Sequence, residues 1–170
     1  SLAPSVKDYE YFFAQYLTEA EDVIYISATD KIGKCYGNAL EASKGFSHVH
    51  VIDSEKISCG QGMMTIVAAK MARDGATVEQ IKNEMEAIKR KIDASFVIPS
   101  VKILYDRGLT DPITAKICDI CRFHPVLGSL PSGKIAVMGV RIGKSENVWR
   151  NYIRFHLSNK ARISDEVIFV

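Results

Sequence analysis

A short apolar strand that runs into a turn of small residues and then into a helix is the feature that most constrains the fold. Residues 48–52 alternate polar and apolar side chains and read as a buried strand. Asp53 and Ser54 stand at its carboxyl end, and Gly60 and Gly62 let the backbone come close to a ligand before the following helix. In α/β proteins, ligands bind at the carboxyl ends of strands, beside helix N-termini. We therefore expect a binding site at this edge.

The rest of the chain reads as alternating helices and strands. Ser5 with Asp8 predicts one helix N-cap, and Thr77 with Gln80 predicts a capping box for another helix. Apolar periodicity predicts helices over 6–20, 36–44, 63–73, 78–92, 101–106, 112–122 and 148–157. Strands are expected at 22–27, 48–52, 95–99, 134–140 and 166–170. This order predicts an α/β fold, with 22–27 and 48–52 at the centre of a parallel sheet flanked by helices.

Composition and charge argue against several classes of function. The 170 residues are 47% hydrophobic, which is enough for a packed core, and the formal net charge is only +2. No run of Lys and Arg stands out, so neither a nucleic-acid partner nor an anionic membrane surface is expected. The longest uncharged central stretch, 57–69, contains two glycines and is too short to span a bilayer. The four cysteines do not form a disulfide framework, which indicates a reducing, cytoplasmic setting.

Two motifs have both a chemical and a structural interpretation. Cys118 and Cys121 form a CxxC that suits redox chemistry or half of a zinc site, but no second pair accompanies it and core packing is favoured. His48 and His50 share one strand face at a spacing that suits a metal, yet no carboxylate or cysteine clearly joins them, so solvent-facing positions are favoured. We expect no metal and no cofactor. No acid–base pair can be named, so an enzyme is not expected, although one acting on an anionic small molecule stays open.

Hydroxyl side chains form the third candidate group. Thr29 follows the strand at 22–27 and precedes a helix, and Ser1 and Ser27 are the other hydroxyls of interest. Such hydroxyls, together with free backbone amides, bind a carboxylate or phosphate without any catalytic residue. Ordinary loop hydrogen bonding and helix capping are the alternative, which the spacing alone slightly favours.

Several short motifs occur in a fixed order along nearly the whole chain. They are the segments 1–5 (SLAPS), 26–36 (ISATDKIGKCY), 52–62 (IDS through SCGQG), 104–108 (LYDRG) and 125–141 (with PVL, GK and VR). The second resembles a strand followed by Ser-Ser-x-Leu-Ser-Gly-Thr-Tyr, and the third resembles Asp-Ser…Ala-Ser-x-Gly-x-Gly. This ordered set resembles the DegV family of bacterial fatty-acid-binding proteins.

The resemblance implies a DegV-like α/β fold with two lobes. Residues 1–75 would form a Rossmann-like α/β part with the parallel sheet, and 76–170 a smaller helical and α+β lobe of the same unit. It further implies a buried tunnel that binds one long-chain fatty acid, which the protein presents to a fatty acid kinase without being an enzyme. By position, Ser1 and Thr29 stand for hydroxyls of the family's carboxylate site, and Lys34 adds a cation. The implied pocket floor and walls are Gly60, Gln61, Gly62, Met63, Phe96 and Ile98.

The loop at 29–35 departs from the family pattern. Asp30 stands where the family has a second serine, and a carboxylate there would repel a fatty-acid headgroup. Lys34 could offset Asp30 or pair with the ligand. The family's first strand and its C-terminal segment are not matched, and a sheet this small is marginal alone, so the fold is expected to be incomplete at both ends. A second hypothesis therefore stays open: a degenerate DegV-like regulatory or interaction domain of a larger multidomain protein that no longer binds fatty acid.

Overall fold

The computed structural model describes residues 3–106, 108 and 110–158. Contacts divide the chain into two compact units. Of the described residues, the first unit comprises 3–94 and 129–134, and the second comprises 95–106, 108, 110–128 and 135–158. The expected domain division between residues 75 and 76 stays a prediction. In the structure, the helix that follows this position packs within the first unit.

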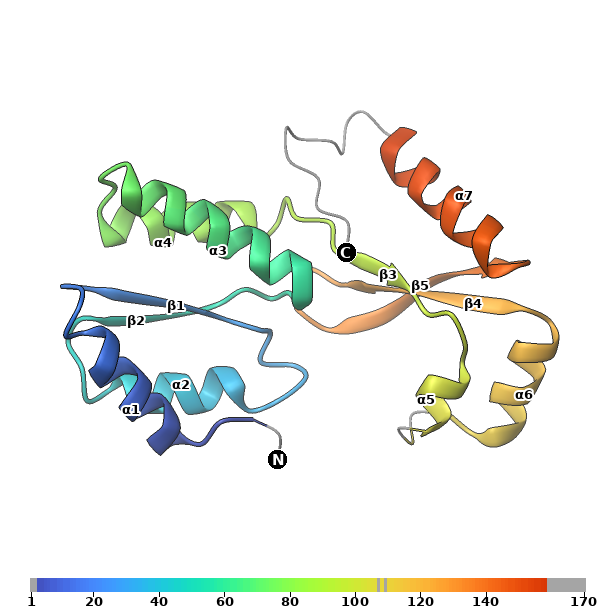
Figure 1. Cartoon of the computed structure of the whole chain (residues 1–170), viewed down its shortest axis with the longest axis horizontal. Helices are drawn as coiled ribbons and strands as arrows, with labels where there is room; N and C mark the ends of the chain where they lie inside the picture. The colour runs from blue at the N-terminus through green and yellow to red at the C-terminus, as the bar shows by residue number, and fades with distance from the viewer. Residues whose placement is uncertain (1–2, 107, 109, 159–170) are drawn as a thin grey trace. The chain divides into compact units, whose positions relative to one another are not determined.

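The first unit is built on two parallel strands, β1 (Val23–Ser27) and β2 (Val49–Asp53). They pair in register from Val23 opposite Val49 to Ser27 opposite Asp53, so the predicted parallel arrangement is confirmed for these two strands, which form a two-stranded sheet in the described residues. Helices α1 (Val6–Tyr16) and α2 (Cys35–Ser43) cover one face, and α3 (Ser58–Arg73) and α4 (Val78–Ile88) cover the other (Figure 1).

Alternation along the strands gives this unit two separate cores. On one face, Val49 packs with Phe13 of α1 and Ala39 of α2. On the other face, Ile26 and Ile52 pack with side chains of α3 and α4, including Met64, Ala68, Ile81 and Met85. Successive strand residues point to opposite faces, so a single five-residue strand contributes to both cores.

The start of α3 differs from the expectation. The helix begins at Ser58 rather than near residue 63, so Gly60 and Gly62 lie inside its first turns and not in a preceding loop. Gly60 explains part of this shift. A Cβ added there would lie 2.9 Å from the Cβ of Ala94 and 3.2 Å from that of Lys56. The absence of a side chain at Gly60 therefore lets the first turn of the helix pack closely against these two residues.

The second unit contains, in its described part, a three-stranded sheet in the order β3 (Ser95–Val97), β4 (Phe123–Ser129) and β5 (Ile135–Ile142). Its helices are α5 (Lys102–Asp106), α6 (Pro112–Ile120) and α7 (Ser145–Ser158). The core consists of Val97, Val126, Val148 and Tyr152. Tyr152 is also tied to β3, because its hydroxyl lies 2.6 Å from Ser95 Oγ.

The second unit departs from the sequence expectations in two respects. Strand β4 was not expected, because Pro125 and Gly128 interrupt its pattern and both residue types are rare inside strands. The expected core packing of the CxxC is wrong for Cys121, which is exposed at the end of α6. The strand predicted at 166–170 lies outside the described residues. The other predicted elements are confirmed, with ends shifted by up to five residues, the largest shift being at the start of α3.

Candidate functional site

The carboxyl ends of β1 and β2 lie side by side because the two strands are parallel and paired through Ser27 and Asp53. Helices α2 and α3 begin just beyond this edge. Their N-cap residues, Lys34 and Ile57, make no side-chain capping hydrogen bond. The first-turn amides of both helices are thus left without a side-chain cap, and such amides attract anions.

Ser27 is the clearest candidate donor at this edge. Its side chain is fully buried, and Ser27 Oγ has no hydrogen-bond partner among the described residues. Its carbonyl, by contrast, accepts a bond of 3.1 Å from the amide of Ser54. A buried hydroxyl without a partner is costly, so it points to a group that completes its bonding. The sequence marked Ser27 only as a hydroxyl at a strand end, without assigning it a place in the carboxylate site.

Thr29, which was assigned to the carboxylate site, has its hydroxyl engaged within the protein. Its Oγ1 donates to the carbonyl of Gly133 at 3.0 Å, and this contact is buried. Ser129 Oγ donates to the carbonyl of Glu55 at 2.7 Å. The turn at 129–134, which belongs to the first unit, is therefore fastened to the strand-end loops at two points. Thr29 can donate to a ligand only if it exchanges the Gly133 carbonyl for it.

The loop that connects β2 to α3 has an unusual backbone. Glu55 and Ser58 have φ values of +53° and +51°, in the left-handed region of backbone conformation that residues other than glycine rarely adopt. Ser54 stabilises the turn, since its hydroxyl donates to the Lys56 carbonyl and accepts from the Lys56 amide, each at 3.1 Å. Backbone of this kind concentrates at functional sites, where the surrounding structure holds it in place.

Acidic groups surround the strand ends. The carboxylate of Asp53 accepts from the amides of Glu55 at 2.8 Å and Asp30 at 3.2 Å. Burial, opposed by these two bonds, raises the pKa of Asp53 above its ordinary value of 3.8, with the charges of Asp30 and Glu55 adding to the rise. Asp30 itself is exposed and pairs with Lys31 at 2.6 Å. The negative charge of an anionic ligand bound here must therefore be balanced by nearby hydrogen-bond donors and cations.

The structure brings some of the predicted site residues together at this edge. Thr29, Lys34 and Gly60 lie in the loops and helix starts beyond the strands, with Lys34 exposed and Gly60 buried. Gln61 Nε2 donates to the carbonyl of Ile26 at 2.9 Å, so this side chain of α3 is hydrogen-bonded to the backbone of β1.

The remaining predicted residues are placed differently. Gly62 and Met63 are partly exposed on α3. Phe96 and Ile98 belong to the second unit, where Ile98 is buried and Phe96 is 40% exposed. Ser1 lies outside the described residues.

Two other features lie away from the strand carboxyl ends. Near the amino ends of the strands, Asp22 Oδ1 lies 2.8 Å from His50 Nε2 and 3.3 Å from His48 Nδ1, a carboxylate that the sequence did not reveal. The expected solvent-facing position holds for His48, which is exposed, whereas His50 is only partly so. No cluster in the described residues is arranged to hold a metal ion.

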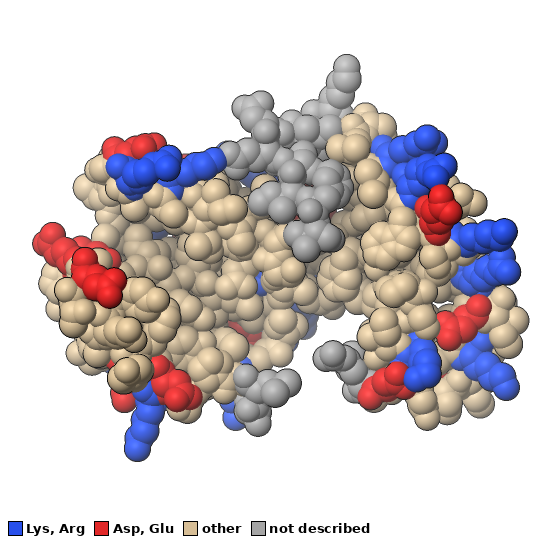
Figure 2. Space-filling view, viewed as in Figure 1, with Lys and Arg blue, Asp and Glu red and all other residues tan. Residues whose placement is uncertain are grey.

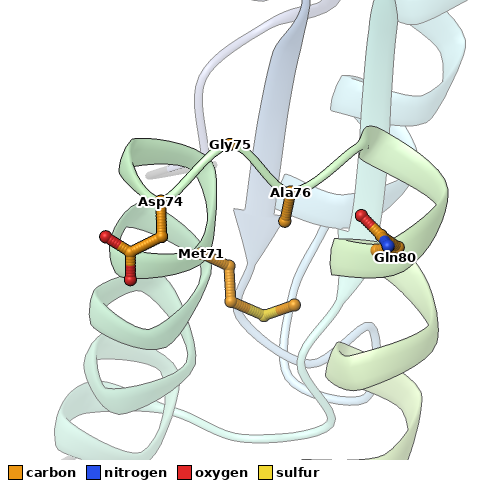
Figure 3. A pocket seen from close by; sticks show the side chains of 5 residues that line it. All are labelled: Met71, Asp74, Gly75, Ala76 and Gln80. Atoms are coloured by element: carbon orange, nitrogen blue, oxygen red, sulfur yellow. The ribbon is translucent and has the colours of Figure 1, made fainter.

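An open depression lies where α3 gives way to α4. It is lined by Met71, Asp74, Gly75, Ala76 and Gln80 (Figure 3). It is wide open to solvent and lies at the α3–α4 turn, whereas the strand-end cluster, which consists of Ser27, Thr29, Asp53 and Ser54, adjoins the start of α3. Charged side chains of both signs occur on each unit in the face that Figure 2 shows. In the described part of the chain, no helix is both long and apolar enough to cross a membrane.

Comparisons with known proteins identify relatives. A family model described as an uncharacterised protein of the DegV family matches residues 1–164. A DegV domain-containing protein of Deinococcus radiodurans is 25% identical over 125 residues, which is 73% of this chain and 44% of the relative. One from Caldanaerobacter subterraneus is 30% identical over 117 residues, covering 68% of this chain and 42% of the relative. The chain spans less than half the length of these two relatives.

Solved structures show the same fold. A DegV family protein from Eubacterium eligens loaded with heptadecanoic acid matches with a TM-score of 0.74 at 16% identity, over 92% of this chain and 57% of that one. A fatty-acid-binding DegV family protein from Thermus thermophilus matches with a TM-score of 0.69 at 24% identity, over 91% and 56%. The fatty acid kinase (Fak) B3 protein of Streptococcus pneumoniae, loaded with linoleic acid, gives 0.73 at 15%, over 92% and 56%.

Proposed function

Because the chain belongs to the DegV family, we propose that it binds a long-chain fatty acid whose carboxylate lies at the carboxyl ends of β1 and β2. The observation that carries this proposal is the buried Ser27 hydroxyl without a hydrogen-bond partner among the described residues. A carboxylate oxygen is a strong acceptor for such a donor, and a hydrogen bond to a charged group is worth about 1.5–3 kcal/mol.

The uncapped helix starts support the same ligand class. The first-turn amides of α2 and α3 lack side-chain caps, and the positive ends of both helix dipoles favour an anion. Thr29 would join the site by exchanging the Gly133 carbonyl for the ligand. Ser1 stays a predicted donor outside the described residues. The assignment of the acyl-chain walls to Gly60, Gln61, Gly62, Met63, Phe96 and Ile98 stays a prediction.

The relatives suggest what happens to the bound ligand. Structural neighbours carry heptadecanoic or linoleic acid, and one of them is a fatty acid kinase B3 protein. We propose that this chain acts as a carrier, not as an enzyme, and that it presents its fatty acid to a fatty acid kinase. A cytoplasmic location is part of the proposal and is supported by the four cysteines, which are all free.

The acidic surroundings favour one alternative. Asp30, Asp53 and Glu55 place negative charge around the strand ends, where a fatty-acid carboxylate would be repelled. A DegV-like regulatory or interaction domain that has lost ligand binding would tolerate these groups. Substituting Asp30 with serine separates the two readings. A carrier should gain affinity for fatty acid, whereas a domain that has lost its pocket should still bind none.

Native mass spectrometry tests the proposal directly. The purified protein is stripped of lipid, incubated with oleate and examined for a bound mass. We expect the wild type to take up oleate and the Ser27→Ala variant to bind it about tenfold or more weakly. The melting temperature of the variant should be unchanged, because the Ser27 hydroxyl has no partner among the described residues to lose. Ser43→Ala on α2 is the matched control, since Ser43 Oγ donates to the carbonyl of Leu40 within the same helix. Failure of the wild type to take up oleate would contradict the proposal.

A further inference from the structure

Lys56 is a buried cation that lacks an ion-pair partner in the described part of the chain. The residue is only 4% exposed, and no carboxylate oxygen of the described residues lies within 4.0 Å of its ammonium. Its stem packs over Gly60, where an added Cβ would lie 3.2 Å from Lys56 Cβ and 3.5 Å from Cγ. Charged residues that are this buried are nearly always paired, so a lysine 4% exposed without an ion pair is unusual.

The neighbouring charges do not supply the partner. Glu55 Oε1 lies 3.0 Å from Lys89 Nζ, and Glu86 binds the same ammonium at 2.7 Å. Lys89 therefore has two carboxylates in contact, whereas Lys56 feels Glu55 and Asp93 only from a distance. Burial lowers the pKa of Lys56 below the ordinary value of 10.5, and the charge of Lys89 lowers it further. The cation is thus held at a cost that an additional anion would relieve.

Backbone contacts place Lys56 beside the strand-end cluster. Its carbonyl accepts from the amide of Thr29 at 2.9 Å, and its amide donates to Ser54 Oγ at 3.1 Å. Ser54 in turn donates its amide to the carbonyl of Ser27 at 3.1 Å. The backbone of Lys56 is therefore one hydrogen bond away from the amide of Thr29 and two away from the carbonyl of Ser27, the residue with the buried hydroxyl.

We propose that Lys56 is the counter-charge of the ligand's carboxylate and makes the site selective for ionised over neutral lipids. This inference rests on the proposed function. Lys34, the cation suggested by the sequence, is exposed at the start of α2, where water and salt screen its charge. The charge of a largely buried lysine acts through a lower effective dielectric than that of an exposed one, so its attraction for a carboxylate is stronger. The surrounding acids no longer exclude the ligand if this cation offsets them.

Paired affinities for oleate and oleyl alcohol test the assignment. The two lipids share an acyl chain, and only oleate carries a charge. Each is measured by competition against a fluorescent acyl probe on the wild type, Lys56→Met and Lys34→Met. We expect Lys56→Met to reduce the preference for oleate by roughly tenfold to a hundredfold, the range of a hydrogen bond to a charged group. Lys34→Met should change it by less than about threefold, as expected for a screened surface charge.

The melting temperature of the ligand-free protein is a second measurement. If Lys56 had a purely structural role, its replacement would lower this temperature. Methionine keeps the apolar stem over Gly60 and removes the buried charge, so Lys56→Met should melt at the same or a higher temperature than the wild type. Lys56→Arg keeps the charge and should retain the preference for oleate. An unaltered preference in Lys56→Met overturns this inference and leaves the proposed function standing. A wild type that binds neither lipid overturns both.

Discussion

Replacing Gly133 with alanine tests how the turn at 129–134 is held at the strand ends. Gly133 has a φ of +78°, which alanine adopts at a cost of about 1–2 kcal/mol. An added Cβ would lie 2.6 Å from Thr29 Oγ1, so the Thr29 hydroxyl must leave the Gly133 carbonyl. Losing this buried hydrogen bond costs about 1 kcal/mol more. We expect Gly133→Ala to lower the free energy of unfolding by about 2–3 kcal/mol.

Gly75→Ala is the matched control for this substitution. Gly75 has a φ of +85°, but nothing lies within 4 Å of a Cβ added there, so alanine costs only the backbone part, about 1–2 kcal/mol. Urea unfolding followed by circular dichroism measures both variants. In a Thr29→Ala background, the excess effect of Gly133→Ala over Gly75→Ala should disappear. Equal destabilisation by the two alanines, or an excess that persists without the Thr29 hydroxyl, would refute the reasoning.

The two glycines of α3 should respond to alanine with opposite signs in thermal unfolding. Gly60→Ala places a Cβ 2.9 Å from that of Ala94 and should destabilise by about 1–3 kcal/mol, whereas Gly62→Ala meets nothing within 4 Å and should stabilise by up to about 1 kcal/mol. Two shifts of the same sign would contradict the packing. At the other end of the sheet, the hydrogen bond from His50 is the main cause that lowers the pKa of Asp22 below 3.8. Its contribution to stability is therefore present above pH 3.8 and lost as the pH falls through the folded value. An NMR titration of Asp22 should show this lowered value, which His50→Val should bring back towards 3.8; no response to the substitution would argue against the contact.

Local patterns predicted the centre of the fold because each pattern had a single physical cause. Strands β1 and β2 alternate so that Ile26 and Ile52 face one core while Val49 faces the other, and period-two alternation encodes this arrangement directly. The capping box at Thr77 likewise depends on residues three apart and is present as expected. Strand β4 was missed because Pro125 and Gly128 oppose strand formation locally, and pairing with β3 overrides them.

The strand ends that form the candidate site could be predicted from the sequence, but the hydrogen bonds between their residues could not. The sequence located the carboxyl ends of β1 and β2, yet the bond from Thr29 to Gly133 joins residues 104 positions apart, which no local pattern encodes. Lys56 offered no signal either. It stands in a charged loop that resembles an ordinary solvated turn, and only the fold shows that it is buried without a paired carboxylate among the described residues.

Photo-crosslinking tests the central claim most directly, because it asks where a fatty-acid carboxylate lies on the protein. A fatty acid that carries a diazirine beside its carboxylate is bound to the protein, irradiated and located by peptide mass spectrometry. We expect labels in the strand-end loops, within 27–35 and 54–61, and we expect excess oleate to remove them. Labels confined to the open depression between α3 and α4 (Figure 3), or labels that oleate does not compete away, would contradict the account.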